Sequence, residues 1–357
     1  MSVLRKYYLD NLRLSTIFLV ILAHIFMIYT VLPYYVHYKD MVVMTVIVYV
    51  MTVWLMPLLF TIAGITTFHS FYKRSVKEYL KERVLRLLVP FISAMIFLNP
   101  VFSFIGMKFH DDLPMNFFDY YFISFGRITD LTGYDGGLTL GPAWFILYLF
   151  IVSCMALVVI MLLKNRVDIS KTNFSLPILV LLGIIPVVLL PVLNTFNGTK
   201  SIGSFLAFFL LGFYVLSNDR VMEKLEKNKI FLGILSLLLT ALYVAAILFP
   251  NEVLISISPY FTTFQGWILV LFLLSIGKSL INKTSKIVKY LSEASFAIYI
   301  FHETALIVIA FYVLQAVSNI YLQMITIFIL TLSASFLFYI MCKKFRVTRF
   351  LFGMKAK

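Results

Sequence analysis

The sequence has few charged residues and almost no cysteine. Only 13% of its 357 residues are charged, whereas 62% are apolar. A soluble protein of this length needs a much larger charged surface, so the composition excludes an ordinary soluble domain. The two cysteines, Cys154 and Cys342, fall in or at the end of apolar runs and lack the spacing of a metal site or a disulfide framework. We therefore expect both to be packing residues.

In place of charge, the sequence has a series of apolar runs with the length of a bilayer-spanning helix, about 20 residues. Lipid offers no hydrogen bonds to the backbone, so such runs cross as helices; the alternating strands of a β-barrel are not seen. The sequence therefore predicts an all-α, polytopic integral membrane protein of about ten transmembrane helices. The runs lie at 14–36, 42–68, 87–106, 142–163, 174–193, 201–217, 230–249, 260–280, 290–316 and 319–341.

The basic residues predict the orientation of these spans. All of the 30 Lys and Arg residues lie in the two ends and in alternate connections, except Lys39, Lys108, Arg127 and Lys200. Because connections rich in Lys and Arg face the cytoplasm, both termini are predicted to be cytoplasmic, provided that the number of spans is even. The net charge of +14 is thus explained by membrane topology. It does not indicate a nucleic-acid-binding domain, which would place the basic residues on a solvated surface.

The longest predicted connection, about 107–141, falls on the outer side. Long connections in compact proteins are usually functional or mobile. Its aromatic stretch, 117–122, is interpreted either as a loop tethered by interfacial aromatic residues or as a short helix in the headgroup layer.

Two histidines are predicted near the middle of the bilayer. His24 lies eleven residues after Arg13, which corresponds to a rise of roughly 16 Å along a helix, and His302 lies at a similar depth, roughly 18 Å from Tyr290. Titratable groups at this depth are costly and often functional, and an imidazole can act as a general base. The alternative is a buried histidine that is hydrogen-bonded to a neighbouring helix. The matched depths allow the two histidines to meet.

Three further residues are close in sequence to these candidates. Glu303 follows His302 directly, so on a helix the two side chains point about 100° apart and need not touch. The segment that begins at His302 lacks the second histidine of a metalloprotease helix, so no metal is predicted. Asp10 lies three residues before Arg13 and can pair with it, although Arg13 is also explained as a snorkelling anchor.

A basic segment precedes the third apolar run. Arg83 and Arg86 lie three residues apart in it and can share one face of a helix. Two guanidinium groups arranged in this way can bind the phosphates of a cytoplasmic ligand. A topology anchor that contacts anionic lipid headgroups explains the same residues.

Taken together, several short motifs resemble the membrane acyltransferase-3 family, over nearly the whole chain. They are Tyr8-Leu-Asp10-Asn-Leu-Arg13 followed by His24, Phe60-Thr-Ile-Ala-Gly64, Arg83-x-x-Arg86, Pro142-Ala-Trp144-Phe-Ile and Ser295-Phe-Ala-Ile-Tyr299-x-x-His302. Within the family, the opening motif and Arg349-Phe-Leu-Phe are most similar to the glucans biosynthesis protein C branch.

The resemblance implies a membrane-embedded O-acyltransferase of the bacterial plasma membrane. Such an enzyme moves an acetyl or succinyl group from cytoplasmic acyl-CoA to a hydroxyl of a cell-surface carbohydrate or glycolipid, and needs no bound cofactor. The resemblance assigns catalysis to Arg13 and His24 and donor binding to Arg83 and Arg86. It places Trp144 on the acceptor side. Residues 1–345 then form the acyltransferase domain and 346–357 a cytoplasmic tail, without an appended soluble domain.

The chain also departs from the family pattern. Ala63 stands where many relatives have serine, Glu303-Thr304 replaces a common proline, and the glutamate that often follows the tryptophan is absent after Trp144. A transporter or flippase of a lipid-linked saccharide is the alternative function. The lack of an inverted repeat and of paired broken helices argues against it. A purely structural scaffold would leave the buried histidines unexplained.

Overall fold

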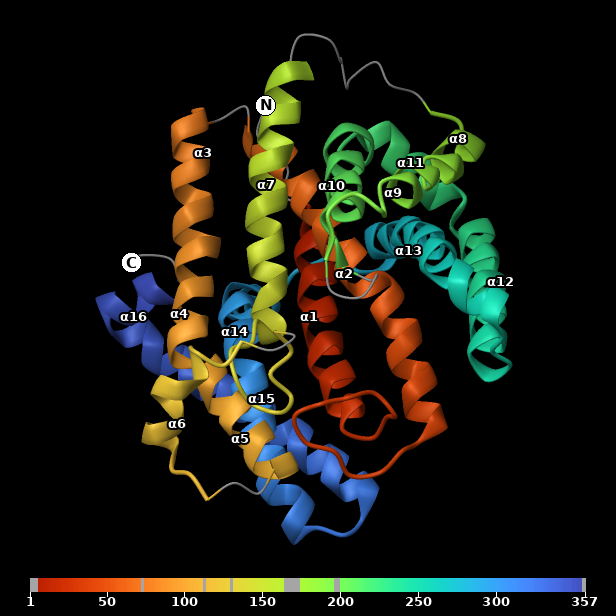
Figure 1. Cartoon of the computed structure of the whole chain (residues 1–357). Helices are drawn as coiled ribbons and strands as arrows, with labels where there is room; N and C mark the ends of the chain where they lie inside the picture. The colour runs from red at the N-terminus through yellow and green to blue at the C-terminus, as the bar shows by residue number, and fades with distance from the viewer. Residues whose placement is uncertain are drawn as a thin grey trace. The chain divides into compact units, whose positions relative to one another are not determined.

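The computed structural model of the chain describes residues 6–71, 74–111, 114–128, 131–163, 174–195 and 200–354 (Figure 1). The predicted basic connection 164–173 lies outside these residues. Within them the chain is mostly helical, and eight helices are long and apolar enough to cross a membrane. Its strands there are a two-residue antiparallel pair, β1 (Asn194–Thr195) and β2 (Lys200–Ser201). The prediction of an all-α polytopic membrane protein is confirmed.

The eight candidate spans correspond to eight of the ten predicted apolar runs. The third is a continuous run from Val76 to Asp111, formed by α3 (Val76–Arg83), the π-helical turn η1 (Val84–Leu88), α4 (Val89–Phe97) and α5 (Asn99–Asp111). The fourth begins with the short turn η2 (Gly141–Ala143). It continues as α7 (Trp144–Leu163). The other six are α1 (Tyr7–Met27), α2 (Val42–Phe71), α12 (Lys229–Leu248), α13 (Glu252–Leu280), α14 (Lys286–Ala316) and α15 (Ile320–Lys344).

The remaining two predicted runs, 174–193 and 201–217, form shorter helices. The first contains α8 (Leu176–Leu181) and α9 (Ile184–Val188), and the prolines and glycine of this run interrupt the backbone hydrogen bonding of a single helix. The second forms α10 (Ile202–Leu211) and the π-helical turn η4 (Gly212–Leu216), and the chain then turns by 96° into α11 (Asp219–Lys227). Ten crossings and two cytoplasmic termini therefore stay predictions.

The end of the first helix differs from the prediction. Residues 28–36 were expected to continue the first span, but α1 ends at Met27. Pro33 has no amide proton and disfavours helical backbone in the preceding residue. The amides of Tyr38 and Met41 instead donate to the carbonyl oxygens of Ile28 and Tyr29, at 3.0 Å each. The segment 28–41 is thus a folded connection that returns to the end of α1.

The described helices pack as two compact units, each with its own core. The first unit contains residues up to 16, 49–80 and 151–289. Within it, α12 and α13 form a helical hairpin (Figure 1). Trp267 is fully buried and its indole N–H donates to the carbonyl oxygen of Leu179, at 2.8 Å.

Two glycines allow close packing of helices in this first unit. A Cβ at Gly64 of α2 would overlap the carbonyl oxygen of Phe209 in α10, and a Cβ at Gly212 would overlap the carbonyl oxygen of Thr61 in α2. The two backbones therefore touch at reciprocal positions. Small residues at helix crossings are the usual means by which membrane helices approach each other this closely.

The opening motif has a structural role in the first unit. The Asn11 side chain donates to the carbonyl oxygens of Ile281 and Lys283, at 2.5 and 2.8 Å, just beyond the C-terminus of α13. In return, the Asn282 side chain accepts from the Tyr8 amide at 3.2 Å. These bonds satisfy two carbonyl groups of the segment that follows α13 and one free amide group in the first turn of α1.

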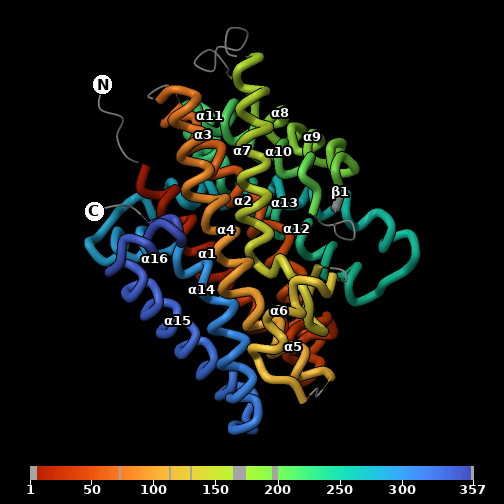
Figure 2. The backbone as a smooth tube through the Cα atoms, turned by 60° about the vertical axis from the view of Figure 1, so that its left-hand side comes forward, coloured from red at the N-terminus to blue at the C-terminus, as the bar shows by residue number. Residues whose placement is uncertain are grey.

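The second unit contains residues 17–48, 81–150 and 290–357. In it α14 and α15 lie side by side (Figure 2), and Tyr290 and Phe301 of α14 contact Tyr339 and Phe338 of α15. The predicted tail is partly helical, because α16 (Arg346–Leu351) packs against α4, and Phe352 is buried against Phe301.

The aromatic stretch 117–122, interpreted either as a tethered loop or as a short helix, is helical and belongs to the second unit. It lies in α6 (Phe117–Ser124), which begins after Asn116, whose side chain accepts from the Asp119 amide at 3.0 Å.

Candidate functional site

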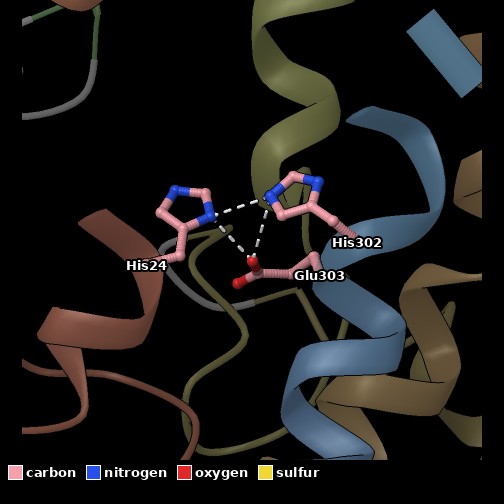
Figure 3. A group of neighbouring side chains, drawn as sticks. All are labelled: His24, His302 and Glu303. Carbon is pink, nitrogen blue, oxygen red and sulfur yellow. Dashed lines mark hydrogen bonds and ion pairs between the residues drawn. The ribbon is translucent and has the colours of Figure 1, made fainter. Parts of the chain in front are cut away.

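Three titratable side chains of the second unit converge (Figure 3). His24, near the end of α1, places its Nδ1 3.0 Å from Nε2 of His302 and 2.8 Å from Oε2 of Glu303. His302 Nε2 and Glu303 Oε2, both on α14, are 3.6 Å apart. The prediction that the two histidines can meet is confirmed, and Glu303 joins them.

The three side chains differ in exposure. His302 is fully buried and the Glu303 side chain is 3% exposed, whereas the His24 side chain is 21% exposed. His24 is therefore the member of the group that a reacting molecule can reach.

The backbone determines the tautomer of His302. Its Nδ1 lies 2.5 Å from the carbonyl oxygen of Tyr299, one turn earlier in α14. A carbonyl oxygen accepts only, so Nδ1 carries a proton and donates it there. In the neutral imidazole, Nε2 of His302 then holds a lone pair and accepts from Nδ1–H of His24.

This arrangement leaves one nitrogen of His24 available. Because Nδ1 of His24 donates to His302 and faces the Glu303 carboxylate, the lone pair of the neutral ring is on Nε2. Nε2 has no hydrogen-bond partner among the residues that the structure describes, and it lies on the far side of the ring from Glu303 (Figure 3). A carboxylate at one nitrogen and a free lone pair at the other is the arrangement of a histidine general base.

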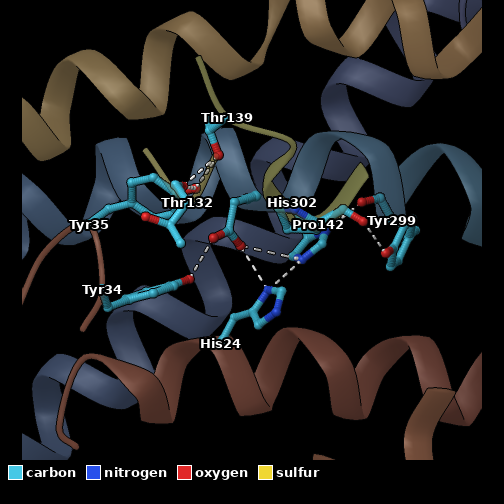
Figure 4. A network of polar contacts seen from close by, with 9 residues as sticks. His24, Tyr34, Tyr35, Thr132, Thr139, Pro142, Tyr299 and His302 are labelled. Carbon is cyan, nitrogen blue, oxygen red and sulfur yellow. Dashed lines mark hydrogen bonds and ion pairs between the residues drawn. The ribbon is translucent and has the colours of Figure 1, made fainter. Parts of the chain in front are cut away.

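Glu303 is held from a segment outside the helices. Its Oε1 accepts from the Tyr34 hydroxyl at 2.7 Å, in the connection that follows α1 (Figure 4). Burial, and then the negative charge of Glu303, raise the pKa of the Tyr34 phenol well above its ordinary value. Tyr34 is therefore a hydrogen-bond donor to the carboxylate throughout the physiological pH range.

The connection of residues 131–142 is hydrogen-bonded around this group in the second unit. The Tyr35 hydroxyl donates to the carbonyl oxygen of Thr132 at 2.7 Å and lies 3.0 Å from Oγ1 of Thr139. The Tyr299 hydroxyl donates to the carbonyl oxygen of Pro142 at 2.6 Å (Figure 4). The connection is thus fixed to both segments that carry the site.

The geometry also bears on metal binding. In the part of the chain that the structure describes, His24, His302 and Glu303 are the group of His, Cys, Asp and Glu side chains compact enough for a metal ion. Direct contacts of 2.8 and 3.0 Å between their polar atoms are hydrogen-bond and ion-pair lengths. We therefore interpret the group as hydrogen-bonded.

Comparison with known proteins gives one family. The family model described as an acyltransferase domain, of the acyltransferase-3 family, matches residues 6–340. The chain belongs to this family. Its members are acyltransferases. No curated protein and no solved structure matches the chain significantly.

Arg13 of the acyltransferase lies in the first unit, three helical turns before His24 on α1. Its guanidinium group contacts the Asp10 carboxylate at 3.0 Å, as the spacing of the two residues predicted. Arg13 is thus not a member of the histidine group, although it is on the same helix.

The two donor-site candidates of the acyltransferase lie where α3 ends. Arg83 is the last residue of α3, and Arg86 lies in the π-helical turn η1, where its Nε contacts Oε1 of Glu82 at 3.3 Å. The i→i+5 bonding of this turn changes the rotation between the two arginines relative to a regular α-helix. Arg86 is exposed and Arg83 is half-buried.

Trp144 begins α7 and is connected to the histidine group by aromatic contacts. Its ring contacts Phe145 at 6.4 Å, Phe145 contacts Tyr299 at 5.7 Å, and Tyr299 contacts His302 at 5.4 Å, measured between ring centroids. The structure thereby connects Trp144 to the site through two intervening rings.

Sequence reasoning did not find Tyr34 of the acyltransferase. The hydropathy of residues 28–36 placed it inside the first span, where a tyrosine has no obvious role. Pro33 was the signal that the helix ends before it.

Proposed function

We propose that the acyltransferase moves an acetyl or succinyl group from acyl-CoA to a hydroxyl of a cell-surface carbohydrate or glycolipid, with His24 as the general base. The observation that carries this proposal is the pairing of His24 Nδ1 with Glu303 and His302, which leaves Nε2 of the one accessible member free. Membership of an acyltransferase family supports the reaction class.

The chemical step follows from this arrangement. Nε2 of His24 takes the proton of the acceptor hydroxyl, and the hydroxyl oxygen attacks the carbonyl carbon of the thioester. The carbon–sulfur bond breaks, the acyl group is now an ester of the acceptor, and the thiolate of coenzyme A receives the proton from His24. The Glu303 carboxylate stabilises the positive charge that His24 carries between these two proton transfers.

The donor and acceptor sites are part of the proposal. Coenzyme A carries several phosphate charges, which suit Arg83 and Arg86 and a basic cytoplasmic side. Trp144 is proposed for the acceptor side. Arg13 is proposed to support catalysis from the same helix as His24. The protein is proposed to lie in the cell membrane with both termini in the cytoplasm, which the distribution of Lys and Arg supports.

The assay uses purified protein in detergent, which gives substrates access from both sides. Acetyl-CoA and succinyl-CoA labelled in the acyl group are supplied with a panel of alkyl glycosides. Label in an ester product supports the proposal. Movement of a lipid-linked saccharide across reconstituted vesicles without consumption of either acyl-CoA would instead support a flippase.

Replacing both Arg83 and Arg86 by glutamine should raise the KM for acyl-CoA at least tenfold and change kcat little, because phosphate binding in the ground state and in the transition state is weakened alike. Steady-state kinetics against acyl-CoA measures this. Lys81→Gln, an exposed residue of the same helix α3, is the matched control. A double variant that behaves like Lys81→Gln contradicts the donor assignment.

Prolonged incubation with a strong chelator, followed by gel filtration, should leave turnover within twofold of untreated protein. The reason is that the site is explained by direct contacts between His24, His302 and Glu303. Loss of activity that returns with one stoichiometric divalent ion would show that the three side chains bind a metal.

A further inference from the structure

Tyr34 is buried beside the histidine group although it comes from a connection between helices. It is 3% exposed, and its hydroxyl donates to Oε1 of Glu303 at 2.7 Å. Neither the hydropathy pattern nor the family motifs point to it. The packing of the helices alone therefore does not explain why this tyrosine is buried beside Glu303.

The two oxygens of Glu303 have different surroundings. Oε1 accepts from Tyr34, whereas Oε2 is buried without a hydrogen bond of good geometry and faces Nδ1 of His24 at 2.8 Å. The last torsion of a glutamate side chain is broad, so the carboxylate turns easily unless one oxygen is held. The bond from Tyr34 removes that freedom and leaves the second oxygen directed at His24.

Tyr34 is itself held on several sides. Its carbonyl oxygen accepts from Nε2 of His110 at 2.9 Å, and its ring contacts those of Tyr35 and Tyr134 at 5.4 and 6.1 Å between centroids. These contacts come from the connection after α1, from α5 and from the connection of residues 131–142. A side chain held in this way is suited to fix the orientation of another.

We propose that Tyr34 is a positioning residue for acyl transfer, which acts by holding Oε1 of Glu303 so that Oε2 faces His24. This inference rests on the proposed function of His24 as the base. It assigns to the connection between α1 and α2 a part in catalysis without any contact with the acyl group.

The kinetic test compares Tyr34→Phe with Tyr35→Phe. The control removes a neighbouring buried hydroxyl that bonds to Thr132 and Thr139 and not to Glu303. A hydrogen bond to a charged group is worth about 1.5–3 kcal/mol, so Tyr34→Phe should lower kcat roughly 10- to 100-fold, with the KM for acyl-CoA unchanged. Tyr35→Phe should keep kcat within about threefold.

In a Glu303→Gln background, adding Tyr34→Phe should cause no further loss of kcat, because Tyr34 acts through Glu303.

An infrared measurement tests the same bond without turnover. Difference spectra against Glu303→Gln identify the carboxylate band of Glu303; Tyr34→Phe should shift that band, and Tyr35→Phe should leave it in place. If Tyr34→Phe does not yield folded protein, fluorotyrosine labelling, which makes tyrosine a stronger donor, should shift the same band in the otherwise unchanged chain.

The outcomes separate the two proposals. An unshifted Glu303 band, or equal kcat values in Tyr34→Phe and Tyr35→Phe, overturns the role of Tyr34 while His24 keeps its assignment. A wild-type protein that transfers neither acyl group overturns the proposed function, and the infrared result then still decides whether Tyr34 holds Glu303.

Discussion

Replacing His24 by alanine should reduce acyl transfer by about 10²- to 10⁴-fold, which is the usual contribution of a general base. The variant removes Nε2, the free lone pair of the group, and leaves His302 and Glu303 in place. The measurement is the rate of labelled ester formation from acetyl- or succinyl-CoA. Because the side chain is partly exposed, the variant should remain folded.

Two further variants test whether the loss of turnover in His24→Ala is caused by the missing basic nitrogen. His24→Asn keeps an N–H group near the position of Nδ1 but has no basic nitrogen, so it should be as inactive as His24→Ala. His37→Ala removes a histidine that contacts Asp40 at 3.5 Å in the connection after α1, and it should retain full turnover. Undiminished turnover in His24→Ala would refute the catalytic assignment.

Replacing Gly64 or Gly212 by alanine should destabilise the protein strongly. Each added Cβ would overlap a backbone carbonyl oxygen of the opposing helix, which cannot move aside as a flexible side chain does. Overpacking a well-packed interface costs about 1–3 kcal/mol, and both variants should lie at the upper end of that range. Thermal unfolding in detergent, followed by the loss of monodisperse protein, measures the effect.

Gly126→Ala is the matched control for these two variants. A Cβ at Gly126 would be 3.6 Å from the carbonyl oxygen of Ile123, an ordinary contact. This variant should unfold within about 2 °C of the wild type. If Gly64→Ala or Gly212→Ala unfolded at the same temperature as Gly126→Ala, the two helices would not approach each other as closely as the structure shows.

Helices were predictable from the sequence where apolar runs were long and uninterrupted. The run predicted at 319–341 is α15, Ile320–Lys344, and that at 230–249 is α12, Lys229–Leu248. Hydropathy was a poorer guide where prolines and glycines interrupt an apolar run. It extended the first span past Met27 and treated 174–193 as one helix, because an average over a window does not register a single missing amide proton.

The site was predictable in part for a related reason. Depth along a helix follows from residue counting, which is why His24 and His302 were expected at one level. The contact between Glu303 and His24 did not follow, since it depends on the rotation of α14 against α1 within the second unit. The position of Tyr34 was still less predictable from the sequence, because it depends on the path that the connection between two helices takes.

Tyr299 takes part in the site with two different atoms. Its hydroxyl bonds to Pro142, whereas its carbonyl oxygen sets the tautomer of His302. The second bond belongs to the main chain, so every residue that keeps the helix intact at position 299 supplies it. Side-chain substitution there can release the connection of residues 131–142, but it leaves in place the main-chain hydrogen bond that sets the protonation pattern of His302.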